Sequence, residues 1–204
     1  MYSGNYSSSL LEEAVNQFAS LPGIGRKTAL RLALHILGQP KENVDAFASA
    51  FVSLKEQIHY CPQCNMISDD GICPFCNDPH RDNGIVCVVE SLRDVLSIEN
   101  TEQYRGLYHI LGGIISPIDG IGPADLHIRE LIERIKSGQV REVILALSTS
   151  MEGETTSFYI YKQISGFPVA VTTIARGVGF GDDLEYTDEL TLGRSITNRQ
   201  IFKP

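Results

Sequence analysis

The 204-residue chain has no run of 18 apolar residues, and this absence excludes a membrane-spanning helix. Its first nine residues are polar and lack the basic-then-apolar pattern of a secretion signal. We therefore expect a cytoplasmic protein with no membrane partner. Hydrophobic residues make up 43% of the chain, which suffices for one α/β core and a smaller appended module.

The chain also lacks an excess of basic residues, since its formal net charge is -8. Residues 1–60 carry five basic and five acidic groups, whereas residues 81–204 carry twelve basic and seventeen acidic groups. No acid lies between Glu13 and Glu42, although four basic residues fall in that window. Any anion-binding surface should therefore be local and lie in this front segment.

Cysteine is scarce, yet four of the five cysteines form two Cys-x-x-Cys pairs, Cys61 with Cys64 and Cys73 with Cys76. Each pair fits one edge of a tetrahedral Zn²⁺ site. Because four sulfurs leave no open coordination position, the spacing predicts one structural zinc ion per chain in a finger over residues 59–80. The alternatives are two disulfides or four unrelated core thiols, and reducing conditions disfavour disulfides.

Two flanking histidines, His59 and His80, could each replace a sulfur, but four cysteines already complete the site. The fifth cysteine, Cys87, lies in the apolar run 85–89 and is expected to be a buried, inert thiol.

A glycine-rich turn separates two expected helices near the N-terminus. Ser9 and Glu12 have the spacing of a capping box, so the first helix should begin there and end before Pro22. The turn and the next helix start read Pro-Gly-Ile-Gly-Arg-Lys-Thr-Ala over residues 22–29. The second helix is expected to bury Ala29, Leu30, Ala33, Leu34 and Leu37. A third helix over about 44–58 is expected to turn an apolar stripe inward: Val44, Phe47, Ala48, Phe51, Leu54 and Ile58.

The start of the second helix has the features of a phosphate site. Free backbone amides point out of such a turn, and Lys27 and Arg31 lie one helical turn apart on the same face. A P-loop does not fit, because Arg26 stands where that motif has glycine and a helix precedes the turn. The alternative is an ordinary turn between packed helices with solvated charges.

This turn resembles the helix-hairpin-helix motif of DNA-binding proteins, whose amides contact the phosphodiester backbone without reading bases. The resemblance implies DNA binding that is independent of sequence and sensitive to salt.

From residue 85 onward, strand and helix patterns alternate. Strands are expected over residues 85–89, 107–111, 143–147 and 168–174, and helices over residues 92–98, 125–136 and 154–164. This order predicts a mostly parallel sheet with helices on its faces and sites beyond the carboxyl ends of strands. Two such ends carry acids, Glu90 at one and Glu152 with Glu154 at the other.

These acids resemble the metal site of the Toprim domain found in topoisomerases, primases and some nucleases. That family holds Mg²⁺ with a Glu and an Asp-x-Asp, but here Ser148 and Ser150 replace the two aspartates. Neutral hydroxyls should weaken Mg²⁺ binding greatly. Glu90, Glu152 and Glu154 therefore form a residual acidic Toprim site, a patch for a protein partner, or solvated and helix-capping charges.

The order of these segments resembles the bacterial RecR family across nearly the whole chain. It gives a helix-hairpin-helix domain (1–58), a four-cysteine zinc finger (59–80), a Toprim domain (81–175) and a Walker-B-like tail (176–204). Further matches are residues 116–123 and 174–186.

The resemblance implies a non-catalytic recombination mediator in DNA repair. Members of this family act with RecO and RecF and help load RecA onto single-stranded DNA coated by single-strand-binding protein. They form dimers and a ring-like tetramer able to encircle DNA, which implies a location with the nucleoid. Lys27 and Arg31 match DNA-contacting positions, and Arg26 is added from its place in the hairpin. The other interpretation is a Mg²⁺-dependent Toprim enzyme, either a nuclease or topoisomerase-like.

The tail raises two further questions. Its Asp182-Asp183-Leu184-Glu185-Tyr186 segment is similar to a Walker B motif, but without a P-loop we do not expect ATP hydrolysis. The apolar residues of the tail are expected to pack either against the sheet or against a neighbouring subunit: Tyr186, Leu190, Leu192 and Ile196.

Overall fold

The computed structural model describes residues 6, 8–179 and 181–199. The chain divides after Ile58 into two compact units, and each is described by itself. Among the described residues, no helix has the length and apolarity needed to cross a membrane.

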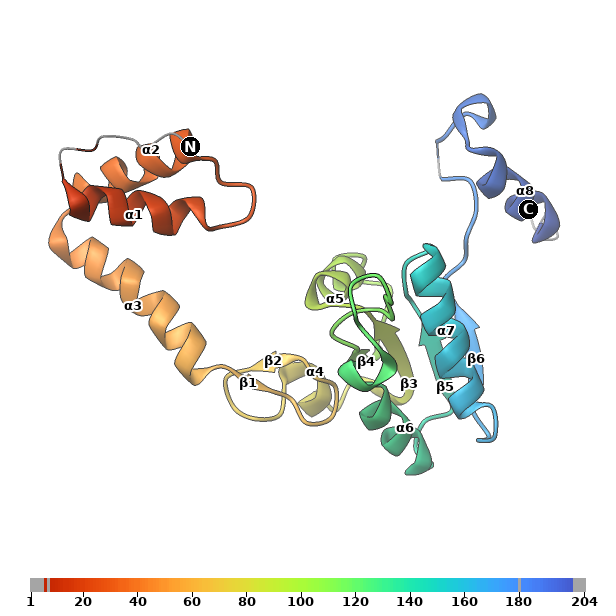
Figure 1. Ribbon diagram of the computed structural model, residues 1–204. Coiled ribbons are helices and arrows are strands. Elements are labelled where there is room, and N and C mark those ends of the chain that lie inside the picture. Colours follow the sequence, from red (N-terminus) through yellow and green to blue (C-terminus); the bar gives the residue numbers. More distant parts are fainter. Residues whose placement is uncertain (1–5, 7, 180, 200–204) are drawn as a thin grey trace. The chain divides into compact units, whose positions relative to one another are not determined.

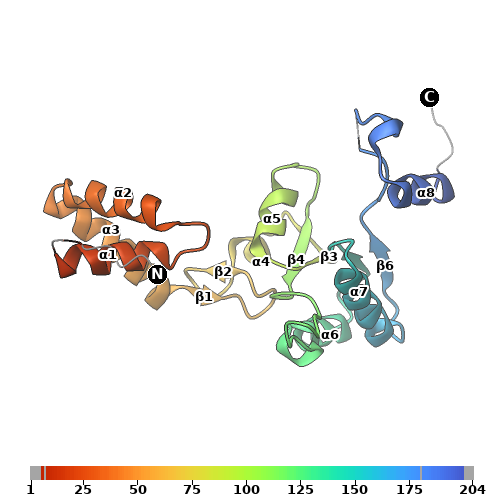
Figure 2. The ribbon, with the colours of Figure 1, turned by 45° about the horizontal axis from the view of Figure 1, so that its top comes forward.

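The first unit consists of three helices: α1 (Ser9–Ala19), α2 (Arg26–Leu37) and α3 (Lys41–Gln57). Helices α1 and α2 pack against each other on either side of the glycine turn (Figure 2). A small core of Val15, Ala29 and Ala33 holds them together. The residue that caps α1 is Ser8, whose hydroxyl accepts the Leu11 N–H at 3.4 Å, so the prediction of Ser9 as the cap was wrong by one residue.

The apolar stripes of α2 and α3 are less buried than their periodicity predicted. In α2, Leu34 and Leu37 are exposed, whereas Ala29 and Ala33 are buried as expected. Helix α3 begins at Lys41, just after Pro40, and has no buried residue. Phe47 and Phe51 on α3 are both exposed and pack edge to face with ring centroids 5.0 Å apart. Periodicity identifies residues that share a face, but it does not show whether another element of the same chain covers that face.

The second unit is built on a four-stranded parallel sheet in the order β4-β3-β5-β6 (Figure 1). Its strands are β3 (Asp82–Val89), β4 (Gly106–Ile110), β5 (Glu142–Leu145) and β6 (Ala170–Thr173). The connecting helices are α5 (Leu92–Glu99), α6 (Ile128–Lys136) and α7 (Met151–Ile164). The predicted mostly parallel α/β fold is therefore confirmed.

Two helix starts differ from the sequence prediction. Helix α6 begins three residues later than expected, because a short 3-10 turn, η1 (Pro123–Asp125), comes first. Helix α7 begins three residues earlier, at Met151, because the Ser150 hydroxyl accepts the Gly153 N–H at 3.1 Å and caps the helix.

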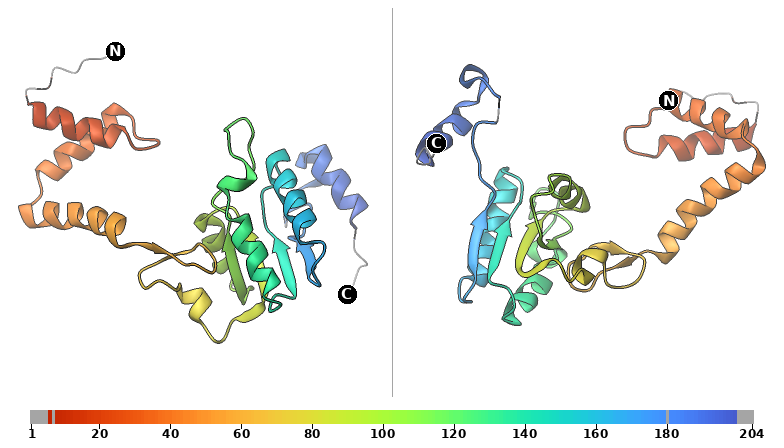
Figure 3. Two further views of the ribbon diagram at one scale, coloured as in Figure 1. Left: turned by 60° about the horizontal axis from the view of Figure 1, so that its bottom comes forward. Right: turned by 180° about the vertical axis from the view of Figure 1, so that it is seen from behind.

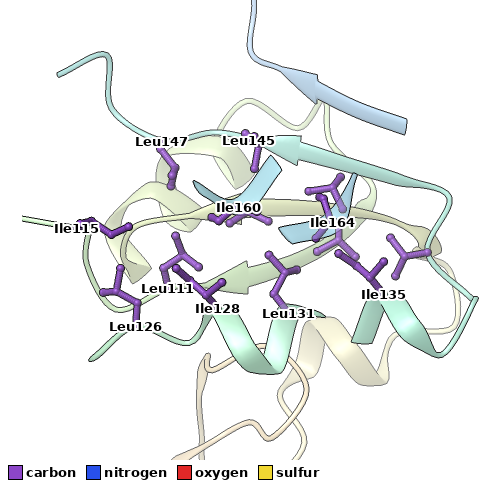
Figure 4. Packing of buried hydrophobic residues seen from close by; sticks show 14 residues of the cluster. Leu111, Ile115, Leu126, Ile128, Leu131, Ile135, Leu145, Leu147, Ile160 and Ile164 are labelled. Carbon is purple, nitrogen blue, oxygen red and sulfur yellow. The ribbon is translucent and has the colours of Figure 1, made fainter. Parts of the chain in front are cut away.

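Alternate residues of β3 enter two cores on opposite faces of the sheet. Val86 and Val88 belong to the larger core. Helices α6 and α7 cover this core with side chains such as Leu131 and Ile160, which are labelled in Figure 4. Cys87 and Val89 face the other core, which contains Val95 of α5 and zinc-finger cysteines. The burial of both faces explains why the strand is a continuous apolar run.

Two smaller parts complete the second unit. The finger contains β1 (His59–Tyr60), β2 (Ile67–Ser68) and the short helix α4 (Pro74–Asn77). After β6, the tail forms a 3-10 turn, η2 (Leu184–Tyr186), and α8 (Glu189–Thr197), seen in blue in Figure 3. Of the four apolar tail residues expected to be packed, Tyr186, Leu190 and Ile196 are exposed and do not pack against the sheet, whereas Leu192 is half-buried.

Candidate zinc centre and nucleic-acid interface

The two Cys-x-x-Cys pairs converge as their spacing predicted. The sulfurs of Cys61, Cys64, Cys73 and Cys76 all lie within 4.8 Å of one another. A tetrahedral ion with Zn–S bonds of about 2.3 Å needs sulfurs about 3.8 Å apart, so this cluster fits zinc. Asn65, with a left-handed φ of 60°, completes the turn of the first pair.

The thiols are close enough to share protons. The pKa of Cys73 is lowered because its sulfur accepts hydrogen bonds from Cys64 and then Cys76. The pKa of Cys64 is raised chiefly by its hydrogen bond to Cys73, whose sulfur lies 3.4 Å away. The packing thus favours a thiolate inside the cluster, and thiolate is the form that ligates zinc.

The finger is joined to the outer edge of β4. The Ile110 N–H donates to the Cys64 carbonyl at 2.9 Å, and the Asn65 amide donates to the Ile110 carbonyl at 3.4 Å. Arg134 of α6 donates to the Tyr108 carbonyl at 2.9 Å. Three of the four cysteines also belong to the same buried cluster as Tyr108 and Ile110. The zinc centre is therefore part of the core of the second unit.

A buried ion pair makes a second connection between finger and sheet. Arg81, whose side chain is 5% exposed, donates to both carboxylate oxygens of Glu99, at 3.0 and 2.6 Å. It also donates to the Gly106 carbonyl at 2.9 Å, and its guanidinium lies 4.5 Å from the centre of the Phe75 ring. The Tyr108 hydroxyl donates to Glu99 at 2.5 Å. We call this group the Arg81 network.

The glycine hairpin of the first unit has the geometry of a backbone-binding turn. Gly23 has φ +78°, and a Cβ built on Gly23 or Gly25 would meet nothing within 4 Å, so a ligand could approach closely. Gly25 is the N-cap of α2 and has no side chain to occupy the first amides of the helix.

The three basic residues at this turn are all exposed but differ in their contacts. Arg26 donates to the Asn16 side chain at 3.1 Å. Lys27 and Arg31 form no ion pair with any acid in the described part of the chain. The two cations are therefore available to an external anion beside the helix amides.

The structure places the three acids at the carboxyl end of the sheet without assembling a metal site from them. Glu90 follows β3, whereas Glu152 and Glu154 lie in the first turn of α7. Within the described residues, the four cysteines are the only group of three or more His, Cys, Asp or Glu close enough to hold an ion.

Glu154 forms ion pairs with two tail arginines, directly with Arg176 and at 3.8 Å with Arg194. Between Glu152 and Glu154, Gly153 packs so tightly that a Cβ would come within 2.2 Å of the Ser148 carbonyl oxygen.

Family models match four consecutive segments of the chain. They are "RecR, helix-hairpin-helix" at residues 11–54, the RecR zinc-finger domain with four cysteines at 58–78, "Toprim domain" at 84–175 and "RecR, C-terminal" at 177–200. Proteins named "Recombination protein RecR" match over nearly their full length. That of Porphyromonas gingivalis is 60% identical over 197 residues, which cover 97% of this chain and 95% of the relative.

The chain belongs to the RecR family. The RecR of Phocaeicola vulgatus is 58% identical (97% of this chain, 96% of the relative), and that of Flavobacterium psychrophilum is 56% identical with the same coverage. Membership establishes a role in recombinational repair and DNA binding. Together with the clustered cysteines, the RecR zinc-finger match establishes one structural zinc ion.

Two features of this RecR chain were missed by sequence reasoning. In the Arg81 network, Arg81 binds Glu99 and Gly106, which lie 18 and 25 positions further along the chain, and no local pattern signals such contacts. The ion pairs of Glu154 with Arg176 and Arg194 depend on how the tail folds back. The only hint of these ion pairs in the sequence is Arg176, a single basic residue just after the last predicted strand.

Proposed function

We propose that this protein is a non-catalytic DNA clamp that acts as an adaptor in recombinational repair. In this proposal residues 1–58 bind DNA, 59–80 carry zinc, 81–175 form the Toprim adaptor domain and 176–204 support assembly. The observation that carries the proposal is the start of α2, whose first amides receive no side-chain cap and have Lys27 and Arg31 exposed beside them, in a chain of the RecR family.

DNA binding is assigned to Arg26, Lys27 and Arg31. Backbone amides and cations at one helix start recognise phosphate groups and not base edges, so binding should be independent of sequence. Arg26 has a smaller share, because its guanidinium is already bound to Asn16.

Assembly into a ring would reconcile an acidic chain with DNA binding. If several copies of a weak local site face one lumen, they bind the same DNA molecule together and hold it more tightly than one site can, while the acidic domains point outward. The uncovered apolar side chains of α3 and α8 support an assembly of this kind, since monomeric proteins rarely expose many large apolar groups together. We propose a dimer that pairs into a ring-like tetramer.

RecO and RecF are the proposed protein partners, and Glu90, Glu152 and Glu154 are the proposed contact positions. With these partners the clamp would help load RecA onto single-stranded DNA coated by single-strand-binding protein. Work on chromosomal DNA would locate it in the cytoplasm with the nucleoid.

A Mg²⁺-dependent nuclease or topoisomerase-like activity is the weaker candidate. Serines stand at both aspartate positions, and Glu154 is already paired with Arg176. Cleavage or relaxation of supercoiled plasmid that is lost in Glu90→Gln would favour the enzyme.

The DNA assignment is tested with Lys27→Ala/Arg31→Ala in binding titrations over a salt series. Removing two phosphate contacts per site should lower affinity and reduce the slope of log K against log[salt] by about 1.4 for each site that a single strand engages. Lys41→Ala is the matched control, because this exposed lysine of the same unit pairs with Asp45 at 2.5 Å. Unchanged affinity and slope in the double variant would refute the assignment.

The clamp itself is tested by light scattering of the protein with circular or short linear DNA. A ring should stay on circular DNA at a salt concentration that releases it from linear DNA. Equal release from both DNAs would contradict encirclement.

A further inference from the structure

The segment 116–123 stood out in the sequence, and the clamp proposal gives it no role. In the structure, Ser116 and Ile121 form an antiparallel bridge with both N–H groups donating, at 3.0 and 2.9 Å. The Asp119 N–H donates to the Ser116 carbonyl at 3.1 Å, and the Ser116 hydroxyl donates to the Asp119 carboxylate at 2.6 Å. Gly120 has φ +73°. These bonds hold residues 116–121 in one conformation. We call residues 116–121 the Ile118 turn.

The turn presents one apolar side chain to solvent. Ile118 is 91% exposed, more than any other large hydrophobic residue in the described part of the chain. Its neighbour Pro117 is also exposed and has a fixed φ. Single exposed apolar residues are common, but this one is held on a hydrogen-bonded turn and loses little entropy when another surface covers it.

The base of the turn is attached to the acidic end of α7. The Ile115 N–H donates to the Thr156 hydroxyl at 2.9 Å, and that hydroxyl donates to the Glu152 carbonyl at 2.7 Å. The loop between β4 and α6, bright green in the left view of Figure 3, is therefore tied to the first turn of α7.

Acidic residues lie on the turn and on the two segments that are hydrogen-bonded to its base. Glu90, on the approach to the turn, accepts the Gly112 N–H through its carbonyl at 3.0 Å, and Asp119 is exposed on the turn itself. Together with Glu152 these acids disfavour DNA as the occupant, because phosphates would be repelled, and they favour a basic protein surface.

We propose that Ile118 is the apolar anchor of a protein-docking surface at the carboxyl end of the sheet. Its occupant is a partner protein with an apolar socket rimmed by basic side chains. An aliphatic anchor that enters a pocket of its partner, with polar contacts around it that exclude water, is the arrangement of a binding hot spot. The inference rests on the proposed function, in which the acidic positions contact a protein partner.

The test measures binding of the full-length protein to purified RecO and, separately, to purified RecF of the same organism. Ile118→Ala should raise the Kd for one of them at least about tenfold. Gly120→Ala adds no contact, because its Cβ would meet nothing within 4 Å, but it disfavours the turn and should raise the same Kd about fivefold. Leu10→Ala, which truncates a highly exposed leucine of the other unit, is the matched control and should change nothing.

The outcomes separate the inference from the function on which it rests. If Glu152→Gln weakens binding and Ile118→Ala does not, the acidic surface stands and the anchor is wrong. If the unmodified protein binds neither RecO nor RecF, the proposed partners fail and the docking surface fails with them. A change in the mass of Ile118→Ala without any partner would overturn the inference in favour of a contact between copies. Equal melting temperatures exclude misfolding as the cause.

Discussion

Replacing Arg81 with methionine should destabilise the second unit strongly. The change leaves the Glu99 carboxylate, 22% exposed, without its cation and leaves the Gly106 carbonyl without a donor. Breaking a buried pair in this way typically costs 3–5 kcal/mol, and the partial exposure of Glu99 favours the lower end, about 3 kcal/mol. For a unit of this size that corresponds to a fall in melting temperature of about 6–12 °C.

The assay is thermal unfolding of the zinc-loaded protein followed by circular dichroism. The matched control is Arg141→Met, because Arg141 also pairs with an acid, Asp82, but its side chain is 63% exposed. Surface pairs contribute little, so this control should melt close to the unmodified protein. A loss for Arg81→Met no greater than that of Arg141→Met would refute the reasoning.

A double-mutant cycle then isolates the pair. Glu99→Gln keeps an acceptor for Tyr108 and removes only the charge. The loss of unfolding free energy in the double variant with Arg81→Met should therefore be smaller than the sum of the losses in the two single variants. Additivity within about 0.5 kcal/mol would mean that the two groups do not stabilise each other.

The pair should also make stability depend on pH. Burial alone would raise the pKa of Glu99, but the hydrogen bonds from Arg81 and Tyr108 outweigh burial and lower it below its ordinary value of 4.5. The stabilisation is therefore complete above pH 4.5 and is lost as pH falls through the lower folded-state pKa. The measurement is the difference in unfolding free energy between the unmodified protein and Glu99→Gln as a function of pH. Both proteins lose zinc in acid, so that effect cancels in the difference.

Three further predictions follow from the metal centre, α3 and the tail. Chelation of zinc should lower the melting temperature of the second unit by roughly 10 °C or more, since the ligands belong to its core. If metal analysis shows that the zinc has been removed and the melting curve is nevertheless unchanged, this prediction is wrong. Phe51→Glu on the exposed face of α3 should reduce the mass of the assembly in light scattering, whereas Ser49→Glu, at an exposed position on the opposite side of the helix, should not. Glu154→Gln should accelerate proteolysis within residues 181–188, because the tail loses its ion pairs with α7, and an identical cleavage rate would disprove that role for Glu154.

The sequence was most informative where a structural feature depends on residues that lie close together in the chain. Two Cys-x-x-Cys pairs sufficed to predict the zinc cluster, because each pair forms one local turn whose geometry the metal fixes. The alternation of strands and helices sufficed for the parallel sheet, although helix starts such as those of α6 and α7 depended on caps and short turns that periodicity does not show.

The sequence was least informative where distant parts of the chain meet. The apolar stripe of α3 reads as a core face, and only the structure shows that nothing in its own unit buries it. Glu154 reads as a possible Mg²⁺ ligand, yet its position relative to Arg176 depends on how the tail folds back, which no local pattern encodes.

The attachment of the finger to β4 also bears on how the protein avoids aggregation. β4 is one of the two edge strands of the sheet, and an open edge strand offers unpaired backbone groups to any other chain. Here the Cys64 carbonyl, the Asn65 amide and Arg134 occupy the outward-facing groups of Tyr108 and Ile110. Zinc binding therefore also keeps this edge of the sheet covered. In a cell short of zinc, newly made chains would expose β4 as an unpaired edge strand that is prone to aggregate.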